Sequence, residues 1–166
     1  MTDVDVAVGD VVPPWRLASV SAARMRLLAA ILRDPNPIHW DRAEVAARGL
    51  GERLVNQGPT NVGYVCNALL AWAGPDSLRR LTVRFTSNVF DGDEVVASGE
   101  VTEVRHEAGE KLVTCQVWLD RGDGTRAVEG EAVVAFADDP DRARSEPSTF
   151  PTEHDQTIDE TTTERT

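Results

Sequence analysis

The stretch PTNVGYVCNALLAWAGP, residues 59–75, decides the fold of this chain. Pro59 suits the first turn of a helix, and Gly74-Pro75 is a stop signal. No charged residue lies between them. A helix that is apolar nearly all round must be enclosed, and this one is too short and too polar to cross a membrane. The sequence therefore predicts one long, buried central helix.

The part of the chain after this helix has the pattern of long strands. Leu81, Val83 and Phe85 alternate with polar residues, as in a half-buried strand. Three further strands are expected at 94–104, 111–119 and 128–136, with turns at 107–110 and 122–124 between them. Such short connections favour an antiparallel meander. These features predict an α+β domain with a curved antiparallel sheet wrapped around the central helix, which is the hotdog architecture.

The part before the central helix predicts three short elements. Val4, Val6 and Val8 alternate with other residues, and later apolar residues recur at helical spacing. Ser and Asp are favoured helix N-caps. The elements expected are an edge strand at 4–8, a helix from Ser19 or Ser21 to Arg33, and a short helix at 42–48 capped by Asp41.

Charge is unevenly distributed along the chain. The formal net charge is −11 over 166 residues, and the nine acidic and three basic residues from Asp138 onward account for −6 of it. This C-terminal stretch has few apolar residues, so it cannot offset the entropy lost on ordering. We expect one hotdog domain at residues 1–137 and an acidic, disordered tail at 138–166.

Composition also makes several classes of protein improbable. No basic stripe is present, which argues against a nucleic-acid partner. No apolar run of about 18 residues suggests a membrane span, and the N-terminus lacks a signal pattern. Cys66 and Cys115 have no CxxC or His partner spacing, so a metal site or disulfide is not expected. The simplest interpretation is a soluble, cytoplasmic protein.

Residues 33–40, RDPNPIHW, are the strongest functional signal. Pro35 and Pro37 each fix their own φ and keep the preceding residue extended. The segment therefore presents the carboxylate of Asp34 and the imidazole of His39 on a stiff loop, as general acid–base chemistry requires. Taken alone, the same pattern could be a turn whose Asp and Asn side chains cap neighbouring backbone groups.

The segment DPNPIH at 34–39 resembles the Asp-x-Asn-Pro-(aliphatic)-His motif of the MaoC-like, (R)-specific enoyl-CoA hydratase family, which has the hotdog fold. The resemblance extends from about Val11 to Phe136. Two departures stand out. Leu32-Arg33 replace the small residue and Gly that usually precede the Asp, and Gln57-Gly58 replace a common His-Gly. The departures put the substrate in doubt more than the chemistry.

The resemblance implies a lyase that adds water reversibly to a 2-enoyl thioester, or dehydrates a 3-hydroxyacyl thioester. It assigns activation of water to Asp34 and His39, and a supporting hydrogen bond to Asn36. No cofactor is expected beyond the CoA or acyl-carrier thioester of the substrate. Gly58 lies at the start of the central helix, where free N–H groups could stabilise the thioester oxygen. Gly58 could also be a simple turn glycine.

Two other functions stay open, as does the assembly. The chain could be a hotdog thioesterase or an enzyme that adds another nucleophile to an enoyl thioester. It could also be one subunit of a heteromeric acyl dehydratase with a second hotdog chain. The resemblance implies a homodimer whose sheets join, with the acyl chain near the interface. Trp72, Tyr64 and the strand ending at Ser87–Phe90 are expected near that seam.

Overall fold

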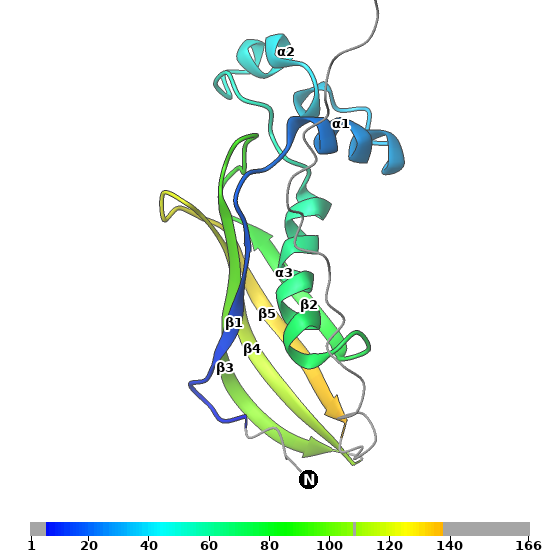
Figure 1. The fold of residues 1–166 in the computed structure, drawn as a ribbon, viewed down its shortest axis with the longest axis vertical. Helices are drawn as coiled ribbons and strands as arrows, with labels where there is room; N and C mark the ends of the chain where they lie inside the picture. Colours follow the sequence, from blue (N-terminus) through cyan, green and yellow to red (C-terminus); the bar gives the residue numbers. More distant parts are fainter. Residues whose placement is uncertain (1–5, 108, 138–166) are drawn as a thin grey trace, which may run out of the picture.

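The computed structural model describes residues 6–107 and 109–137, and its centre is a long helix lying against a curved sheet (Figure 1). The tail and the domain boundary predicted from the sequence lie outside these residues. The elements in chain order are β1 (Val11–Leu17), α1 (Ala22–Ile31), the short 3-10 helix η1 (Pro37–His39), α2 (Arg42–Ala47), α3 (Gly58–Ala73), β2 (Leu78–Phe85), β3 (Val95–Glu107), β4 (Glu110–Arg121) and β5 (Arg126–Ala137).

The sheet has the strand order β1-β3-β4-β5-β2, and each neighbouring pair is antiparallel. The predicted meander is therefore right for β3, β4 and β5 and wrong for β2, which crosses to the far edge beside β5. The reason is that β3 already has β1 and β4 as neighbours, so no position beside it is left for β2. The α+β hotdog architecture itself is as expected.

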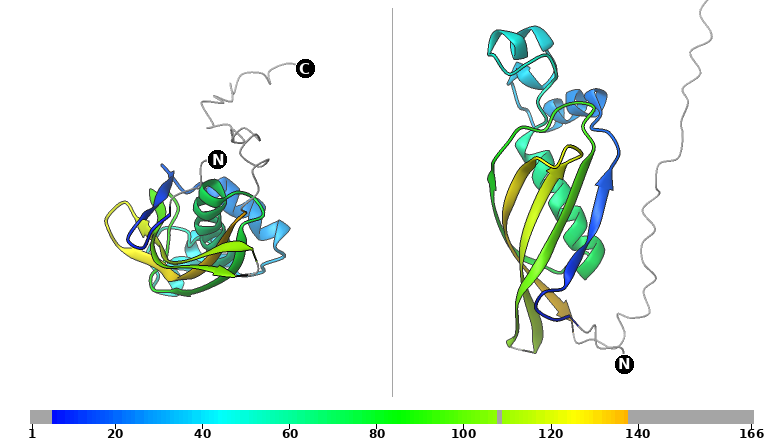
Figure 2. Two further views of the ribbon diagram at one scale, coloured as in Figure 1. Left: turned by 90° about the horizontal axis from the view of Figure 1, so that it is seen from below. Right: turned by 90° about the vertical axis from the view of Figure 1, so that its left-hand side faces the viewer.

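The central helix α3 packs on the concave face of the sheet (Figures 1 and 2). Val65, Ala68 and Leu69 on α3 are buried in the core that it shares with the strands. The expectation that the helix is enclosed all round is wrong for its other face, where Asn67 and Ala71 are exposed. The sheet of a single chain covers only one side of α3, because one face of a sheet contacts only the side of the helix that is turned toward it.

The N-terminal edge strand lies later in the chain than predicted. Residues 6–8 form no strand, and β1 instead contains Pro13 and Pro14. A proline cannot donate a hydrogen bond to a neighbouring strand, so it is tolerated at sheet edges and bulges. β1 is such an edge strand, and its register with β3 shifts between Val12 and Trp15.

The two short helices agree with the sequence prediction and form an overhang, residues 22–57, beyond the end of the sheet at the start of α3 (Figures 1 and 2). Ser21 caps α1, since its Oγ accepts from the Arg24 N–H at 3.3 Å. Asp41 caps α2, since its Oδ1 accepts from the Ala43 N–H at 2.8 Å. None of the helices that the structure describes is long and apolar enough to cross a membrane.

Candidate active site

Helix α1 ends in a way that holds the backbone of Asp34. The Asp34 N–H donates to the Ala29 carbonyl at 2.9 Å, and the Arg33 N–H donates to the Ala30 carbonyl at 3.2 Å. This pair of bonds is the Schellman motif, which needs a left-handed residue between the helix and its last donor. Arg33 takes that conformation, with φ of 52°. Asp34 is therefore attached to the end of α1 through its own backbone.

The structure brings Asp34 and His39 together. After the extended residue Asn36, Pro37 begins the 3-10 helix η1, which carries His39 at its end. His39 Nε2 lies 3.1 Å from Asp34 Oδ2. The other carboxylate oxygen, Oδ1, accepts from the Asn36 N–H at 3.0 Å. One carboxylate oxygen of Asp34 thus makes a local turn, as in the alternative interpretation of the motif, while the other faces the imidazole.

The hydrogen bonds of His39 distinguish its two ring nitrogens. Nδ1 lies 2.6 Å from the carbonyl oxygen of Val55. A carbonyl oxygen only accepts, so Nδ1 carries a hydrogen, and Nε2 is the nitrogen that can exchange a proton. The His39 side chain is 7 % exposed and that of Asp34 is 28 % exposed. The pair is therefore reached from outside through the carboxylate.

Residues 54–56 connect this pair to the central helix. The Val55 N–H donates to the Ile38 carbonyl at 3.0 Å, so both backbone groups of Val55 face the 38–39 segment. Leu54 and Asn56 face the other way, toward residues 89–91. Such alternation is a property of extended backbone. Sequence reasoning missed Val55, because a residue that acts through its carbonyl leaves no side-chain signal.

Gly58 is the first residue of α3, and Gln57 is its N-cap. The Gln57 carbonyl accepts from the Thr60 and Asn61 N–H groups. Pro59 has no N–H, and the Gly58 N–H has no partner inside the helix. A Cβ on Gly58 would lie 3.1 Å from the ring of Phe85. A side chain at position 58 would thus press on Phe85 at the end of β2, which is a further residue of this region that the motif did not indicate.

Other residues hold the start of α3 in place. The buried side-chain amide of Gln57 donates to the Met25 carbonyl of α1 at 2.8 Å. Asn56 Nδ2 donates to Asn61 Oδ1 at 2.7 Å.

The side chain of Asn36 contacts the end of α2. Arg48, the C-cap of α2, donates to Asn36 Oδ1 at 3.3 Å. Asn36, expected to support the site, is therefore directed at α2 in this chain, and it also donates its N–H to Asp34.

A cavity of about 480 Å³ lies between β1, α1 and α3, and an adjoining cavity of about 280 Å³ lies between α1 and α3. They share Leu28, Thr60, Tyr64 and Asn67, and neither is lined by the Asp34–His39 pair. Burial raises the pKa of Tyr64, against the opposing influence of the Asn56 hydrogen bond and of Arg24. The Tyr64 phenol therefore keeps its proton at neutral pH. Their combined size suits an acyl chain.

The apolar residues expected at a dimer seam are mostly used within the chain. Tyr64 stacks on Trp15 with ring centroids 5.3 Å apart, and Trp72 packs edge-on against Phe136 at 5.1 Å. The expected strand ending at Ser87–Phe90 is wrong, since β2 ends at Phe85. Val89 is fully buried and Phe90 makes an isolated bridge with Val55. The chain leaves the sheet here because it must cross back to β3.

Comparisons with known proteins agree with this architecture. Residues 7–121 match the model of the MaoC like domain family. The (R)-specific enoyl-CoA hydratase of Aeromonas caviae is 34 % identical over 116 residues, which are 68 % of this chain and 84 % of that protein. These matches confirm the resemblance inferred from the motif at residues 34–39.

Solved structures point to the same fold. The (R)-hydratase from Aeromonas caviae involved in PHA biosynthesis superposes with a TM-score of 0.71 at 30 % identity, covering 80 % of this chain and 98 % of that one. The ChsH1–ChsH2 complex from Mycobacterium tuberculosis has a chain with a TM-score of 0.68 at 26 % identity, covering 79 % and 98 %. The protein is thus a hotdog-fold chain that belongs to the MaoC-like domain family.

Proposed function

We propose that this protein adds water reversibly to a 2-enoyl thioester and so forms a 3-hydroxyacyl thioester. The observation that carries the proposal is the Asp34–His39 pair, with Nε2 and Oδ2 3.1 Å apart and Nδ1 bound to the Val55 carbonyl. The similarity to a hydratase described as (R)-specific supports the (R) configuration of the product. Asp34 and His39 are the proposed catalytic residues.

In the proposed reaction the pair holds one water molecule against C3 of the substrate. His39 Nε2 or Asp34 Oδ2 takes a proton from this water as its oxygen bonds to C3. The same proton is then delivered to C2, which completes the addition. Because Nδ1 stays bound to the Val55 carbonyl, the imidazole keeps its orientation while Nε2 gains and loses the proton. Dehydration follows the same steps in reverse.

Negative charge develops on the thioester oxygen as water attacks C3. We propose that the Gly58 N–H, at the positive end of the α3 dipole, donates to this oxygen. A donor of this kind contributes about 3 kcal/mol to transition-state stabilisation. The absence of a Cβ on Gly58 supports this role, because the thioester can approach its N–H closely. The acyl group of the substrate is attached to CoA or to an acyl carrier, and the proposed steps use no other cofactor.

The direct test is an assay of the purified protein with crotonyl-CoA and with a longer or branched 2-enoyl-CoA. Loss of the enoyl absorbance without release of free thiol is the expected result. Release of free thiol would show a thioesterase instead, and an amine adduct formed in preference to the hydroxyl would show another nucleophile. Chiral analysis of the product should give the (R)-3-hydroxyacyl thioester.

A second candidate is the catalytic half of a heteromeric dehydratase. The similarity to a chain of a two-component complex favours it, with 26 % identity over nearly all of that chain. This chain keeps both Asp34 and His39, so we propose that it would supply the chemistry in such a pair. A folded chain that is inactive on every enoyl-CoA alone, and active after addition of a second hotdog subunit, would support this candidate.

A further inference from the structure

We propose that Asp91 is a positioning residue that holds the imidazole of His39 in its reactive orientation. The effect on rate rests on the function proposed above. The hydrogen-bond geometry that carries the inference does not depend on that function. Asp91 lies in the loop between β2 and β3, far from His39 in the sequence.

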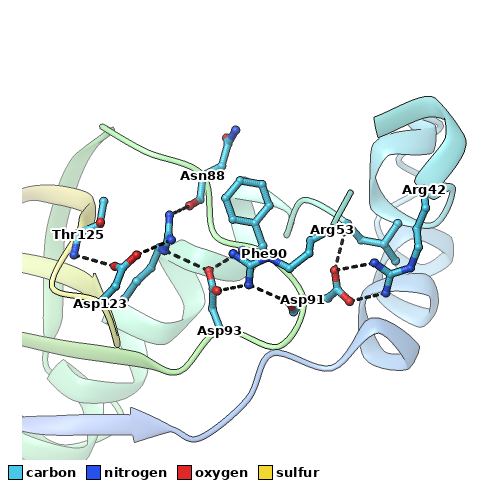
Figure 3. A network of polar contacts seen from close by, with 10 residues as sticks. Arg42, Arg53, Asn88, Phe90, Asp91, Asp93, Asp123 and Thr125 are labelled. Carbon is cyan, nitrogen blue, oxygen red and sulfur yellow. Dashed lines mark hydrogen bonds and ion pairs between the residues drawn. The ribbon is translucent and has the colours of Figure 1, made fainter. Parts of the chain in front are cut away.

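Asp91 binds two segments that follow His39 in the chain, one at Arg42, which Figure 3 labels, and one at Leu54. Its Oδ2 lies 2.5 Å from a guanidinium nitrogen of Arg42, the first residue of α2, which follows η1 directly. Its Oδ1 accepts from the Leu54 N–H at 2.6 Å. Leu54 immediately precedes Val55, whose carbonyl binds His39 Nδ1. One carboxylate therefore holds both the helix after the imidazole and the acceptor of the imidazole.

Several bonds make this attachment firm. The Asp91 side chain is 13 % exposed and that of Arg42 is 53 % exposed, so the carboxylate is shielded from solvent while the guanidinium is partly open to it. Arg42 also donates to the Glu52 carbonyl at 3.0 Å. The Asp91 N–H donates back to the Leu54 carbonyl at 3.0 Å. Leu54 and Asp91 thus exchange two hydrogen bonds, which fixes the plane of the peptide that leads into Val55.

The loop that carries Asp91 is itself fixed to the sheet (Figure 3). Asp93 pairs with Arg53 at 2.5 Å and with Arg121 of β4 at 3.2 Å. The two guanidinium groups lie 4.8 and 5.4 Å from the ring centre of Phe90, within cation–π range. The loop that carries Asp91 is therefore held firmly against the sheet. Through the contacts of Asp91, the loop fixes where the overhang, residues 22–57, lies relative to the sheet.

The backbone groups of residues 54, 55 and 56 point alternately toward residues 89–91, which include Asp91, and toward residues 38–39. This alternation is the reason to expect that Asp91 affects the orientation of the imidazole as well as stability. The backbone N–H and carbonyl of Val55 face Ile38 and His39, while its neighbours on either side bond to residues 89–91. The Val55 carbonyl belongs to the peptide that it shares with the Asn56 N–H, and this N–H donates to the Val89 carbonyl. The Asp91 carboxylate therefore acts by holding segment 54–56 and α2 in place relative to each other. Without it the two segments can shift, and the Val55 carbonyl then leaves the line of the Nδ1–H. Displacements of this size lower turnover because catalytic groups must be placed within a fraction of an ångström.

The experiment compares Asp91→Ala and Asp91→Asn with the wild type. We expect Asp91→Ala to lower kcat about 10- to 100-fold with KM within about twofold, because the misplaced group acts in the transition state. Asp91→Asn keeps an oxygen for the Leu54 N–H, so its loss should be smaller. The matched control is Asp123→Ala. This substitution removes a carboxylate of the same network, one that binds Arg121 and Thr125. That variant should retain wild-type kcat.

Two readouts separate positioning from a structural role. A ring-nitrogen NMR correlation at about pH 8, above the usual titration range of histidine, should show a protonated Nδ1 on His39 in the wild type and a mixed tautomer in Asp91→Ala. In a double-mutant cycle, Asp91→Ala should cost nothing further in a His39→Ala background. A purely structural defect would lower the residual activity again.

The outcomes are distinct from those of the proposed function. If the wild type hydrates no enoyl thioester, the proposed function fails, and the NMR tautomer still decides the role of Asp91. An unchanged Nδ1–H signal with unchanged kcat in Asp91→Ala would overturn the inference. If Asp91→Ala does not fold, Asp91→Asn carries the test. Failure of both variants to fold would assign Asp91 to stability alone and would also overturn it.

Discussion

At the scale of single residues, a backbone group from another segment sets which ring nitrogen of His39 faces Asp34. The Val55 carbonyl lies 2.6 Å from Nδ1 and leaves Nε2 to face Asp34. The motif places the two side chains close together in sequence, but nothing in it indicates which ring nitrogen would be free. The geometry therefore adds the direction of proton transfer to the proposal.

The first prediction concerns this pair. His39→Ala and Asp34→Asn should each lower hydration by about 10²-fold or more, the usual scale for a positioned acid or base. Both residues lie in the overhang, so the sheet and α3 should keep their circular dichroism. His106→Ala is the control, because His106 is an exposed residue of β3. Near-wild-type turnover in a well-folded His39 or Asp34 variant would refute their catalytic assignment.

The second prediction concerns Arg33, whose φ of 52° is left-handed. A non-glycine residue in this conformation carries a strain of about 1–2 kcal/mol, part of which Gly relieves despite its greater freedom in the unfolded chain. Arg33→Gly should raise the free energy of unfolding by about 0.5–1 kcal/mol. Arg26→Gly, the same substitution inside α1, should lower it by about 1 kcal/mol. Denaturant titration of both variants checks the sign, and equal destabilisation would contradict the strain at Arg33.

At the scale of elements, β2 reaches the far edge of the sheet through a close approach to β5. Gly130 of β5 is paired with Val83 of β2. A Cβ on Gly130 would lie 2.1 Å from the Thr82 carbonyl oxygen and 2.8 Å from Val83 Cα. These are backbone atoms, which cannot move aside as a side chain can. The glycine therefore permits the pairing that closes the sheet around α3.

The third prediction follows from this contact. Gly130→Ala should lower the free energy of unfolding by at least about 2 kcal/mol, since overpacking against backbone must shift a strand. Gln116→Ala, at an exposed position of the neighbouring β4, should change it by less than about 0.5 kcal/mol. Thermal and denaturant unfolding measure both. A Gly130 variant as stable as the wild type would mean that β2 and β5 do not approach so closely.

At the scale of the whole molecule, the two edges of the sheet differ. The β1 edge carries Pro13 and Pro14 and a register shift, features that protect an edge from pairing with another chain. The β2 edge, LRRLTVRF, has no proline, and Phe85 at its end is 56 % exposed. The open face of α3 lies on the same concave side. Both features favour assembly through β2.

The fourth prediction is therefore a homodimer with its two sheets joined at β2. Light scattering on the isolated chain should give twice the mass of one chain, with two equivalent sites related by a two-fold axis. Hydratase activity should fall on dilution below the dissociation constant, because Phe85 at the end of β2 lies against Gly58, the proposed donor to the thioester oxygen. A folded monomer with full activity at nanomolar concentration would contradict this assembly.

Local sequence patterns were enough to predict the central helix, the three long strands β3 to β5 and the candidate pair Asp34 and His39. Apolar periodicity, helix caps and proline restrictions act over a few residues, so a single chain displays them directly. This short range also explains why the first strand was predicted too early in the chain. In the sequence, two consecutive prolines indicate the end of a strand, and only the structure shows that β1 lies at an edge, where prolines are tolerated.

The strand order, the ring nitrogen of His39 that faces Asp34 and the contact between Leu54 and Asp91 were visible only in the folded structure. Each depends on hydrogen bonds between segments far apart in sequence, such as Val55 with His39 and Leu54 with Asp91. Backbone groups are the same in every residue, so the partners that they choose leave no trace in local sequence patterns. The placement of β2 beside β5 likewise follows from which sheet edge remains available once β1, β3 and β4 have paired.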